Sequence, residues 1–158
     1  MITMICGYPG SGKSTLAERL ARESGGAVLD LDALVAAMTG VEIHAEPLDR
    51  RVVFAVDQYV WQLAREIENR GMDVYVIRTA PGAIEHEQYA RFCARIYVDT
   101  PVEVCRERCR ARSDYDPEAF EAACRKVNLY MSAYGANMRK MKERGEIDER
   151  DGDTGASV

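Results

Sequence analysis

Residues 7–15 read Gly7-Tyr8-Pro9-Gly10-Ser11-Gly12-Lys13-Ser14-Thr15 and fit the pattern G-x-x-x-x-G-K-[ST] at every position. The apolar run 1–6 precedes this stretch, and leucines and alanines at spacing four follow it. The context predicts a strand, a tight glycine loop and then a helix, an arrangement that cradles a polyphosphate. An ordinary glycine turn before a helix is the alternative.

Each residue type in this loop has a chemical reason. Gly7, Gly10 and Gly12 let the backbone curl without Cβ clashes, so that several N–H groups point at one anion. Lys13 is expected to contact the β- and γ-phosphates, and Ser14 to offer its hydroxyl to Mg²⁺. We therefore expect all nine residues, 7–15, to bind a nucleoside triphosphate, with Tyr8 packing against a lid or against the nucleotide.

Length and composition indicate one compact enzyme domain. The 158 residues are 47% apolar, which is enough for a continuous core. The five cysteines lack the spacing of a disulfide framework or a metal cluster, and no signal peptide or long apolar span is visible, so we expect a reduced, cytoplasmic protein. The net charge of -5 lies mostly in residues 143–158, so global charge gives no argument for nucleic-acid binding.

Strand-like and helix-like segments alternate along the chain, as a parallel sheet with crossover helices requires. Helix starts are predicted at Thr100-Pro101 and Asp116-Pro117, each with a capping residue before a proline. We expect a kinase-like domain over 1–142 and a disordered acidic tail over 143–158. The predicted strands are 2–6, 27–31, 73–78 and 95–98, and the predicted helices are 13–23, 32–38, 49–70, 82–91, 101–112 and 117–142.

Two carboxylates follow the second predicted strand. Asp30 and Asp32 lie at the carboxyl edge of the sheet, where ligands bind, and would project to the same side if the strand continued. We expect Asp30 to help hold Mg²⁺ and Asp32 to accept a proton from a substrate hydroxyl. The alternative is that Asp32 caps a helix beginning at Ala33 while Asp30 is solvated.

The glycine loop resembles the G-x-P-G-S-G-K-S-T loop of polynucleotide-kinase-like and zeta-toxin-like proteins, and Asp30-x-Asp32 is similar to the D-x-D of shikimate kinases. The chain thus resembles the P-loop kinase group that includes adenylate kinases, shikimate kinases and phage-type polynucleotide 5′-hydroxyl kinases. The resemblance implies an α/β three-layer P-loop NTPase fold: a short parallel sheet of about four strands, flanking helices and a small lid. It also implies ATP and Mg²⁺ as cofactors, and contact between Asp32 and the phosphate-accepting hydroxyl.

A third similarity involves arginines. Pro101 followed by Arg108 and Arg112 looks like the P-x-x-x-x-x-x-R-x-x-x-R that precedes the mobile lid of nucleotide kinases, where such arginines hold nucleotide or the transferring phosphate. We place both on one face of helix 101–112, before a lid at 112–117, and expect them to be catalytic together with Lys13 and Asp32. A solvated helix with arginines paired to glutamates is the alternative.

The chain also departs from these families. Arg78 follows the third strand where many relatives carry Asp, and Val35 stands where polynucleotide kinases have Arg. Arg78 either binds an anionic group of the acceptor or pairs with a nearby carboxylate. Asp99 also ends an apolar strand, but in these families that strand leads to the lid arginines.

The acceptor region is expected between the second and third strands, at 33–72. Its helical apolar residues are predicted to be core, and Arg50 and Arg51 to contact an acceptor or to lie on a solvated surface. Trp61 is expected to pack rather than to stack on a base. The predicted core positions are Val53, Val56, Val60, Leu63 and Ala64.

Two function classes remain from the sequence. The favoured one is a kinase that moves the γ-phosphoryl group of ATP to a hydroxyl or phosphate acceptor, with a nucleoside, a nucleotide or a nucleic-acid 5′ end as the favoured acceptor. The alternative is a P-loop ATPase or nucleotide switch that acts through a protein partner. An AAA+ motor is disfavoured, because 158 residues are too few for its helical lid subdomain and sensor regions.

Overall fold

The computed structural model describes residues 1–40, 50–81, 93–113 and 115–143. Its centre is a parallel four-stranded sheet in the order β2-β3-β1-β4, so the carboxyl ends of all four strands meet at one edge. The register places Ile5 beside Ile77 and Ile96. The strands are β1 (Ile2–Cys6), β2 (Ala27–Asp30), β3 (Val74–Ile77) and β4 (Cys93–Tyr97).

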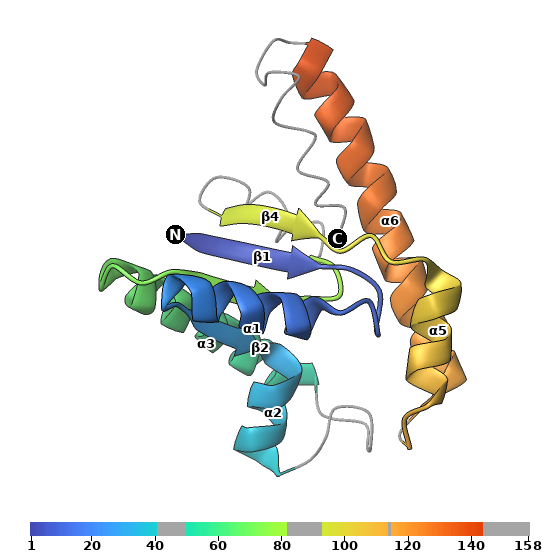
Figure 1. The fold of residues 1–158 in the computed structure, drawn as a ribbon, viewed down its shortest axis with the longest axis horizontal. Coiled ribbons are helices and arrows are strands. Elements are labelled where there is room, and N and C mark those ends of the chain that lie inside the picture. Colours follow the sequence, from blue (N-terminus) through green and yellow to red (C-terminus); the bar gives the residue numbers. More distant parts are fainter. Residues whose placement is uncertain (41–49, 82–92, 114, 144–158) are drawn as a thin grey trace.

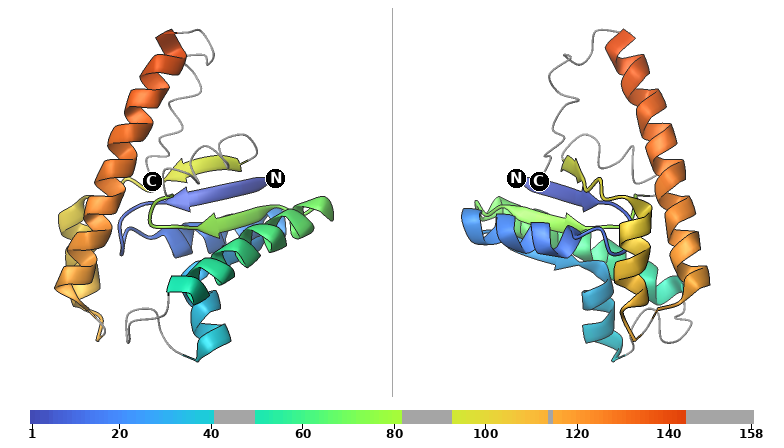
Figure 2. Two further views of the ribbon diagram at one scale, coloured as in Figure 1. Left: turned by 180° about the vertical axis from the view of Figure 1, so that it is seen from behind. Right: turned by 45° about the vertical axis from the view of Figure 1, so that its right-hand side comes forward.

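The described helices cover both faces and the carboxyl edge of the sheet (Figures 1 and 2). α1 packs on one face, whereas α3 lies on the opposite face with α2 beside it. α5 and α6 lie beyond the carboxyl ends of β1 and β4, and the distal part of α6 extends away from the sheet. The bounds are α1 (Lys13–Ser24), α2 (Leu31–Thr39), α3 (Arg50–Asn69), α5 (Val102–Arg110) and α6 (Pro117–Glu143).

Alternation along β1 creates the two faces of the core. Ile2, Met4 and Cys6 pack with the α3 side, whereas Ile5 packs with Ala17 on the α1 side. β1 is buried at every position because both faces are covered, as is usual for a central parallel strand. The predicted core of the acceptor helix is confirmed: Val56, Val60 and Ala64 are buried, Leu63 packs against them from a partly buried position, and Val53 is half-buried.

The predicted α/β fold with four parallel strands is confirmed, with changes at element ends. β2 stops at Asp30 because α2 begins at Leu31, β4 begins two residues earlier than predicted, and α5 ends at Arg110 instead of 112. The predicted helix 82–91 and the predicted tail after Glu143 lie outside the described residues.

α5 and α6 are joined by a small apolar cluster of their own. Cys105, Cys109, Phe120 and Cys124 are buried in it, and Tyr8 packs against it. All five cysteines are buried free thiols, which confirms that Cys105 and Cys109 act as small hydrophobic residues. Asp116 caps α6 as predicted, since its carboxylate accepts the N–H groups of Glu118 (2.9 Å) and Ala119 (3.3 Å).

Candidate active site

The glycine loop connects β1 to α1 and leaves the first turn of α1 open to a ligand. Gly12 is the N-terminal cap of α1 with φ +96°, a left-handed conformation that favours glycine, and no side chain caps this helix start. The first amides of a helix need acceptors from outside the helix. The loop therefore presents uncapped N–H donors together with the positive end of the α1 dipole, as an anion site requires.

Lys13 lies at the mouth of this loop and donates to the loop's own carbonyls. Its Nζ is 3.0 Å from the Gly7 carbonyl oxygen and 2.6 Å from that of Tyr8. Burial lowers the pKa of Lys13 from its ordinary value, and the nearby carboxylates of Asp32 and Asp30 oppose that shift. The side chain is thus already positioned against the loop and close to both acids.

The phosphate loop is supported by Thr100, from the segment between β4 and α5, and by Arg108 of α5. The Thr100 hydroxyl donates to the Ser11 carbonyl (2.9 Å), and Nη1 of Arg108 donates to the Gly10 carbonyl (3.3 Å). Thr100 was predicted to cap α5, which is wrong: Pro101 is the cap residue and no side chain bonds the helix start. The Thr100 hydroxyl stabilises the phosphate loop instead.

α5 also approaches the loop closely at Gly10. This glycine has φ +77°, and a Cβ on it would stand 2.8 Å from the Cys105 carbonyl oxygen and 2.9 Å from the Cys109 sulfur. Tyr8 binds the same side of the molecule, because its hydroxyl donates to the Asn128 side-chain carbonyl of α6 (2.5 Å). The loop and the α5–α6 pair therefore form one packed unit.

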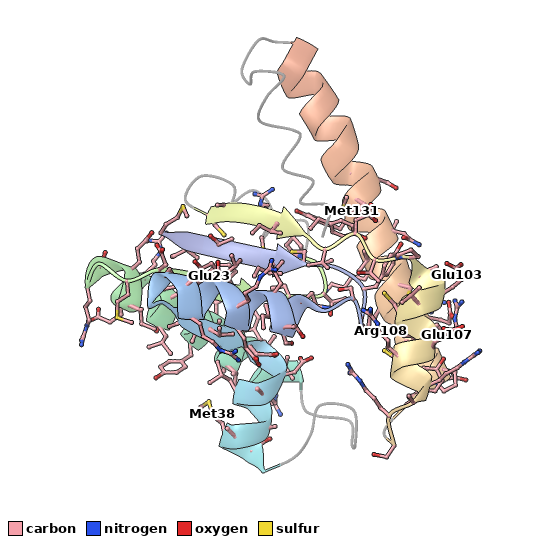
Figure 3. All side chains as sticks on the ribbon, viewed as in Figure 1. Glu23, Met38, Glu103, Glu107, Arg108 and Met131 are labelled. Carbon is pink, nitrogen blue, oxygen red and sulfur yellow. The ribbon has the colours of Figure 1, made fainter. Side chains whose placement is uncertain are left out.

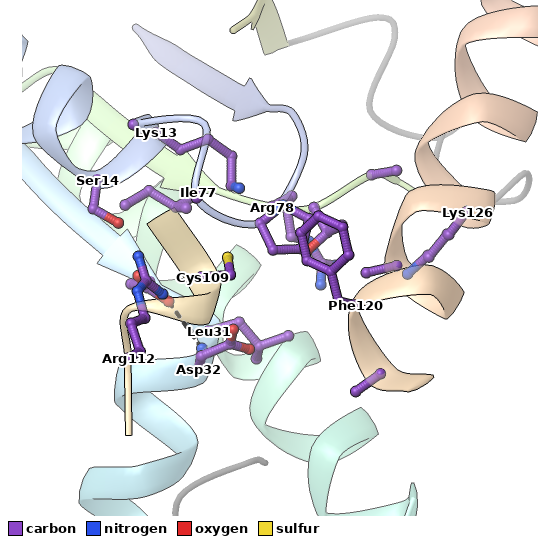
Figure 4. A pocket seen from close by; sticks show the side chains of 18 of the residues that line it. Lys13, Ser14, Leu31, Asp32, Ile77, Arg78, Cys109, Arg112, Phe120 and Lys126 are labelled. Atoms are coloured by element: carbon purple, nitrogen blue, oxygen red, sulfur yellow. Dashed lines mark hydrogen bonds between the residues drawn. The ribbon is translucent and has the colours of Figure 1, made fainter. Parts of the chain in front are cut away.

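A cavity of about 510 Å³ opens in front of the loop, at the carboxyl edge of the sheet (Figure 4). Asp30 and Asp32 both line it. The carboxylate of Asp30 accepts the backbone N–H groups of Asp32 (3.0 Å) and Ala33 (3.4 Å), so Asp30, not Asp32, caps the following helix. Because that helix starts at Leu31, the predicted strand-like projection of both acids is wrong. Asp32 instead lies exposed in the first helical turn, at the cavity wall.

The two arginines expected near the lid have separate positions. Arg112 lies beyond the end of α5 and lines the cavity, whereas Arg108 lies on α5, outside the cavity lining, and bonds the glycine loop. They do not share a helix face, because α5 ends at Arg110. Figure 3 shows Arg108 pointing toward the loop, while Glu103 and Glu107 lie on the outer side of α5.

Arg78 follows β3 and forms the expected pair with a carboxylate, while its binding of an acceptor anion stays a prediction. It lines the cavity, and its Nη2 lies 2.5 Å from a carboxylate oxygen of Asp57 on α3. The two side chains are only 9% and 11% exposed, and the guanidinium lies 6.0 Å from the ring centroid of Trp61. An ion pair and a cation–π contact thus hold this guanidinium at the cavity wall.

The structure places most of the predicted site residues in the cavity lining. These are Pro9, Gly10, Gly12, Lys13, Ser14, Thr15, Asp30, Asp32 and Arg112. Gly7 and Ser11, also residues of the loop, are buried. Sequence reasoning missed Lys126 and Phe120 on α6, which also line the cavity, because helix periodicity alone does not show which face of α6 meets the loop.

A glycine loop before a helix, a cavity at the carboxyl edge and helices on both faces define the class of P-loop nucleotide-binding folds. Residues 2–136 match a family described as an AAA domain, and the chain belongs to this family. This match does not test whether the chain works as an AAA+ motor. The expectation that it is too short for one stays a prediction. No curated protein matches the chain in sequence at a significant level.

Solved kinases and a repair complex have similar structures. A chain of the Pnkp1/Rnl/Hen1 RNA repair complex matches with TM-score 0.67 and 19% identity, over 84% of this chain and 45% of that chain. Shikimate kinase from Acinetobacter baumannii in complex with shikimate matches with TM-score 0.61 and 21% identity (87% and 78% covered). A sugar kinase from Janibacter sp. HTCC2649 matches with TM-score 0.60 and 18% identity (79% and 76% covered). At these identities the likeness establishes the fold, and this chain spans less than half the length of the repair-complex chain.

None of the described helices combines the length and hydrophobicity that a membrane crossing requires.

Proposed function

We propose that the protein is an ATP-dependent phosphotransferase that moves the γ-phosphoryl group to a hydroxyl or phosphate acceptor. A nucleoside, a nucleotide or a nucleic-acid 5′ end is the favoured acceptor. One observation carries the proposal: a single cavity is lined by Lys13 of the glycine loop, by Asp32 and by Arg112. A phosphate-binding cation, a candidate base and a second cation are the groups that phosphoryl transfer uses.

The residues present fit ATP and Mg²⁺. The uncapped start of α1 and Lys13 suit a triphosphate, and Ser14 and Asp30, which carry side-chain oxygens, line the same cavity. Mg²⁺ prefers oxygen ligands and takes few of them from protein, the rest coming from phosphates and water. Bound there, Mg²⁺ would neutralise phosphate charge.

Each residue would have one task during transfer. The Asp32 carboxylate takes the proton of the acceptor hydroxyl while the acceptor oxygen bonds to the γ-phosphorus and the bond from that phosphorus to the β–γ bridging oxygen breaks. Lys13 and Arg112 stabilise the negative charge on the phosphoryl oxygens. A phosphate acceptor is already ionised and would need no base. Dependence on Asp32 therefore distinguishes a hydroxyl acceptor from a phosphate acceptor.

The test is ATP consumption with Mg²⁺ against nucleosides, nucleoside monophosphates, 5′-hydroxyl oligonucleotides and small hydroxy acids. Both ADP and phosphorylated product are measured. We expect a phosphorylated product from at least one acceptor class. ADP release that no acceptor changes would contradict the proposal.

The second candidate is a P-loop ATPase or switch that acts through a protein partner. One observation favours it: the family that the chain matches is described as an AAA domain. ADP release without phosphorylated product would support this candidate, and Asp32 would then have no acceptor proton to take.

A further inference from the structure

The cavity has a second group of cations, remote from the glycine loop in sequence. Arg78 comes from the end of β3 and Lys126 from α6, and both line the cavity together with Phe120. In Figure 4 Arg78 lies beside Phe120, and Lys126 extends from α6 toward them. Neither side chain belongs to the loop that is expected to bind the triphosphate.

Two of the carboxylates that line the cavity also cap helices. Asp30 accepts two N–H groups at the start of α2, and Asp116 accepts two at the start of α6. Asp32 is assigned above to the acceptor hydroxyl. When Lys13 and Arg112 contact the triphosphate, the cations left for an acceptor are Arg78 and Lys126.

The two cations have complementary properties. Arg78 is nearly buried and is held by Asp57 and Trp61, so its guanidinium loses little conformational freedom on binding. A guanidinium has five N–H donors and can bind a carboxylate or phosphate while it keeps its bond to Asp57. Lys126 is exposed and can reach into the cavity from its flexible stem.

We propose that Arg78 and Lys126 form a subsite for an anionic group of the acceptor, a carboxylate or a phosphate, while the acceptor hydroxyl faces Asp32. The inference rests on the proposed function, since it names the acceptor class as an anionic alcohol. Phe120, which lines the same cavity, supplies an apolar surface for the body of such an acceptor.

The test is a binding experiment that needs no turnover. The glycine loop is first saturated with a non-hydrolysable ATP analogue and Mg²⁺, and analogue binding is measured separately. Two matched pairs are then titrated: thymidine with thymidine 3′-monophosphate, and methyl shikimate with shikimate. Binding is followed by calorimetry and by the fluorescence of Trp61, the single tryptophan, which contacts Arg78.

We expect the anionic member of at least one pair to bind about tenfold more tightly than its neutral partner, as one charge-assisted contact provides. The pair that shows the preference distinguishes phosphate from carboxylate. Lys126→Met should abolish most of it, whereas Arg125→Met, which removes the neighbouring exposed cation, should leave it intact. Equal or undetectable binding within both pairs, or equal losses in the two variants, overturns the inference.

Arg78 needs a paired variant because its removal alone would leave Asp57 buried and without this cation. The double substitution Asp57→Asn with Arg78→Met should keep the circular dichroism spectrum and lose the anion preference. A folded double variant that keeps the preference excludes Arg78 from the subsite. An anion preference without any phosphorylated product would contradict the proposed function while supporting the subsite, so the two failures are distinguishable.

Discussion

Lys13 contacts the backbone of the glycine loop and carries the charge that is expected to bind phosphate. Its Nζ bridges two loop carbonyls, and burial lowers its pKa while the neighbouring acids oppose that shift. Lys13→Ala should lower nucleotide turnover at least about a hundredfold, because a preorganised cation at the phosphates is lost. Steady-state ADP release measures this. Arg22→Ala, on the exposed side of the same helix, should stay near wild type, and equal losses in both variants would argue against a specific role for Lys13.

Asp30 and Asp32 are close in sequence but have separable tasks. Asp32→Asn should abolish transfer to a hydroxyl acceptor and leave ATP affinity within about twofold, because the amide cannot accept the proton. Asp30→Ala should cost about 1 kcal/mol of unfolding free energy through loss of the α2 cap. Product formation, nucleotide titration and urea denaturation measure the three quantities. Full transfer activity in Asp32→Asn would remove it as the base.

At the scale of elements, α5 stabilises the phosphate loop by contacting the loop's backbone. Arg108 bonds the Gly10 carbonyl from outside the cavity, so we predict that Arg108→Met raises the Kd for ATP about fivefold to tenfold through loss of loop order. Nucleotide titration and single-turnover rates separate binding from chemistry. Arg110→Met on the same helix is the matched control. A thousandfold loss of transfer rate at unchanged Kd would instead place Arg108 on the transferring phosphate.

The order of elements could be predicted because each signal is local. Glycines, prolines and apolar periodicity identified β1, α1, α3 and α6 to within a few residues. Helix ends were less predictable. Leu31 begins α2 because Asp30 supplies the cap, and α5 stops at Arg110, which separates Arg112 from the face of Arg108. Asp30 and Asp32 are both good capping residues, and the sequence pattern alone does not show which of them begins the helix.

The residues of the candidate site also divide into those that the sequence could predict and those that only the structure shows. The glycine loop, Asp32 and Arg112 could be located from motifs, because the chemistry of phosphate binding restricts residue type and spacing. Lys126, Phe120 and the bond from Thr100 to Ser11 could not. Each of these residues lies beside a segment that is far away in the chain. The residue type alone does not indicate which segment that will be. The role of Arg78 could not be decided from the sequence. In the structure this residue both pairs with Asp57 and lines the cavity.

For the whole molecule, buried thiols in the central sheet predict sensitivity to alkaline pH. Burial raises the pKa of Cys6 to about 12 and that of Cys93 to about 11, from 9.0. The folded state therefore keeps these thiols protonated, so their contribution is complete below pH 9 and declines as pH rises toward 11 and 12. We expect the free energy of unfolding to fall by about 2 kcal/mol for Cys93 between pH 8 and 10.5.

Urea denaturation at the two pH values measures this fall, and Cys93→Ala separates the thiol from lysines and tyrosines that titrate in the same range. The alanine variant should lose less stability than the wild type over that interval. An identical fall in both proteins would show that Cys93 is not responsible.

The contact between Gly10 and Cys109 restricts how this fold can change in evolution. The sulfur of Cys109 occupies the space beside Gly10, and the carbonyl oxygen of Cys105 fills the rest. A bulkier residue at position 109 would displace the phosphate loop, and any side chain at position 10 would displace α5. A change in one segment therefore requires a matching change in the other. A loop transplanted from another member of this fold should function only when the small residue of α5 is transplanted with it.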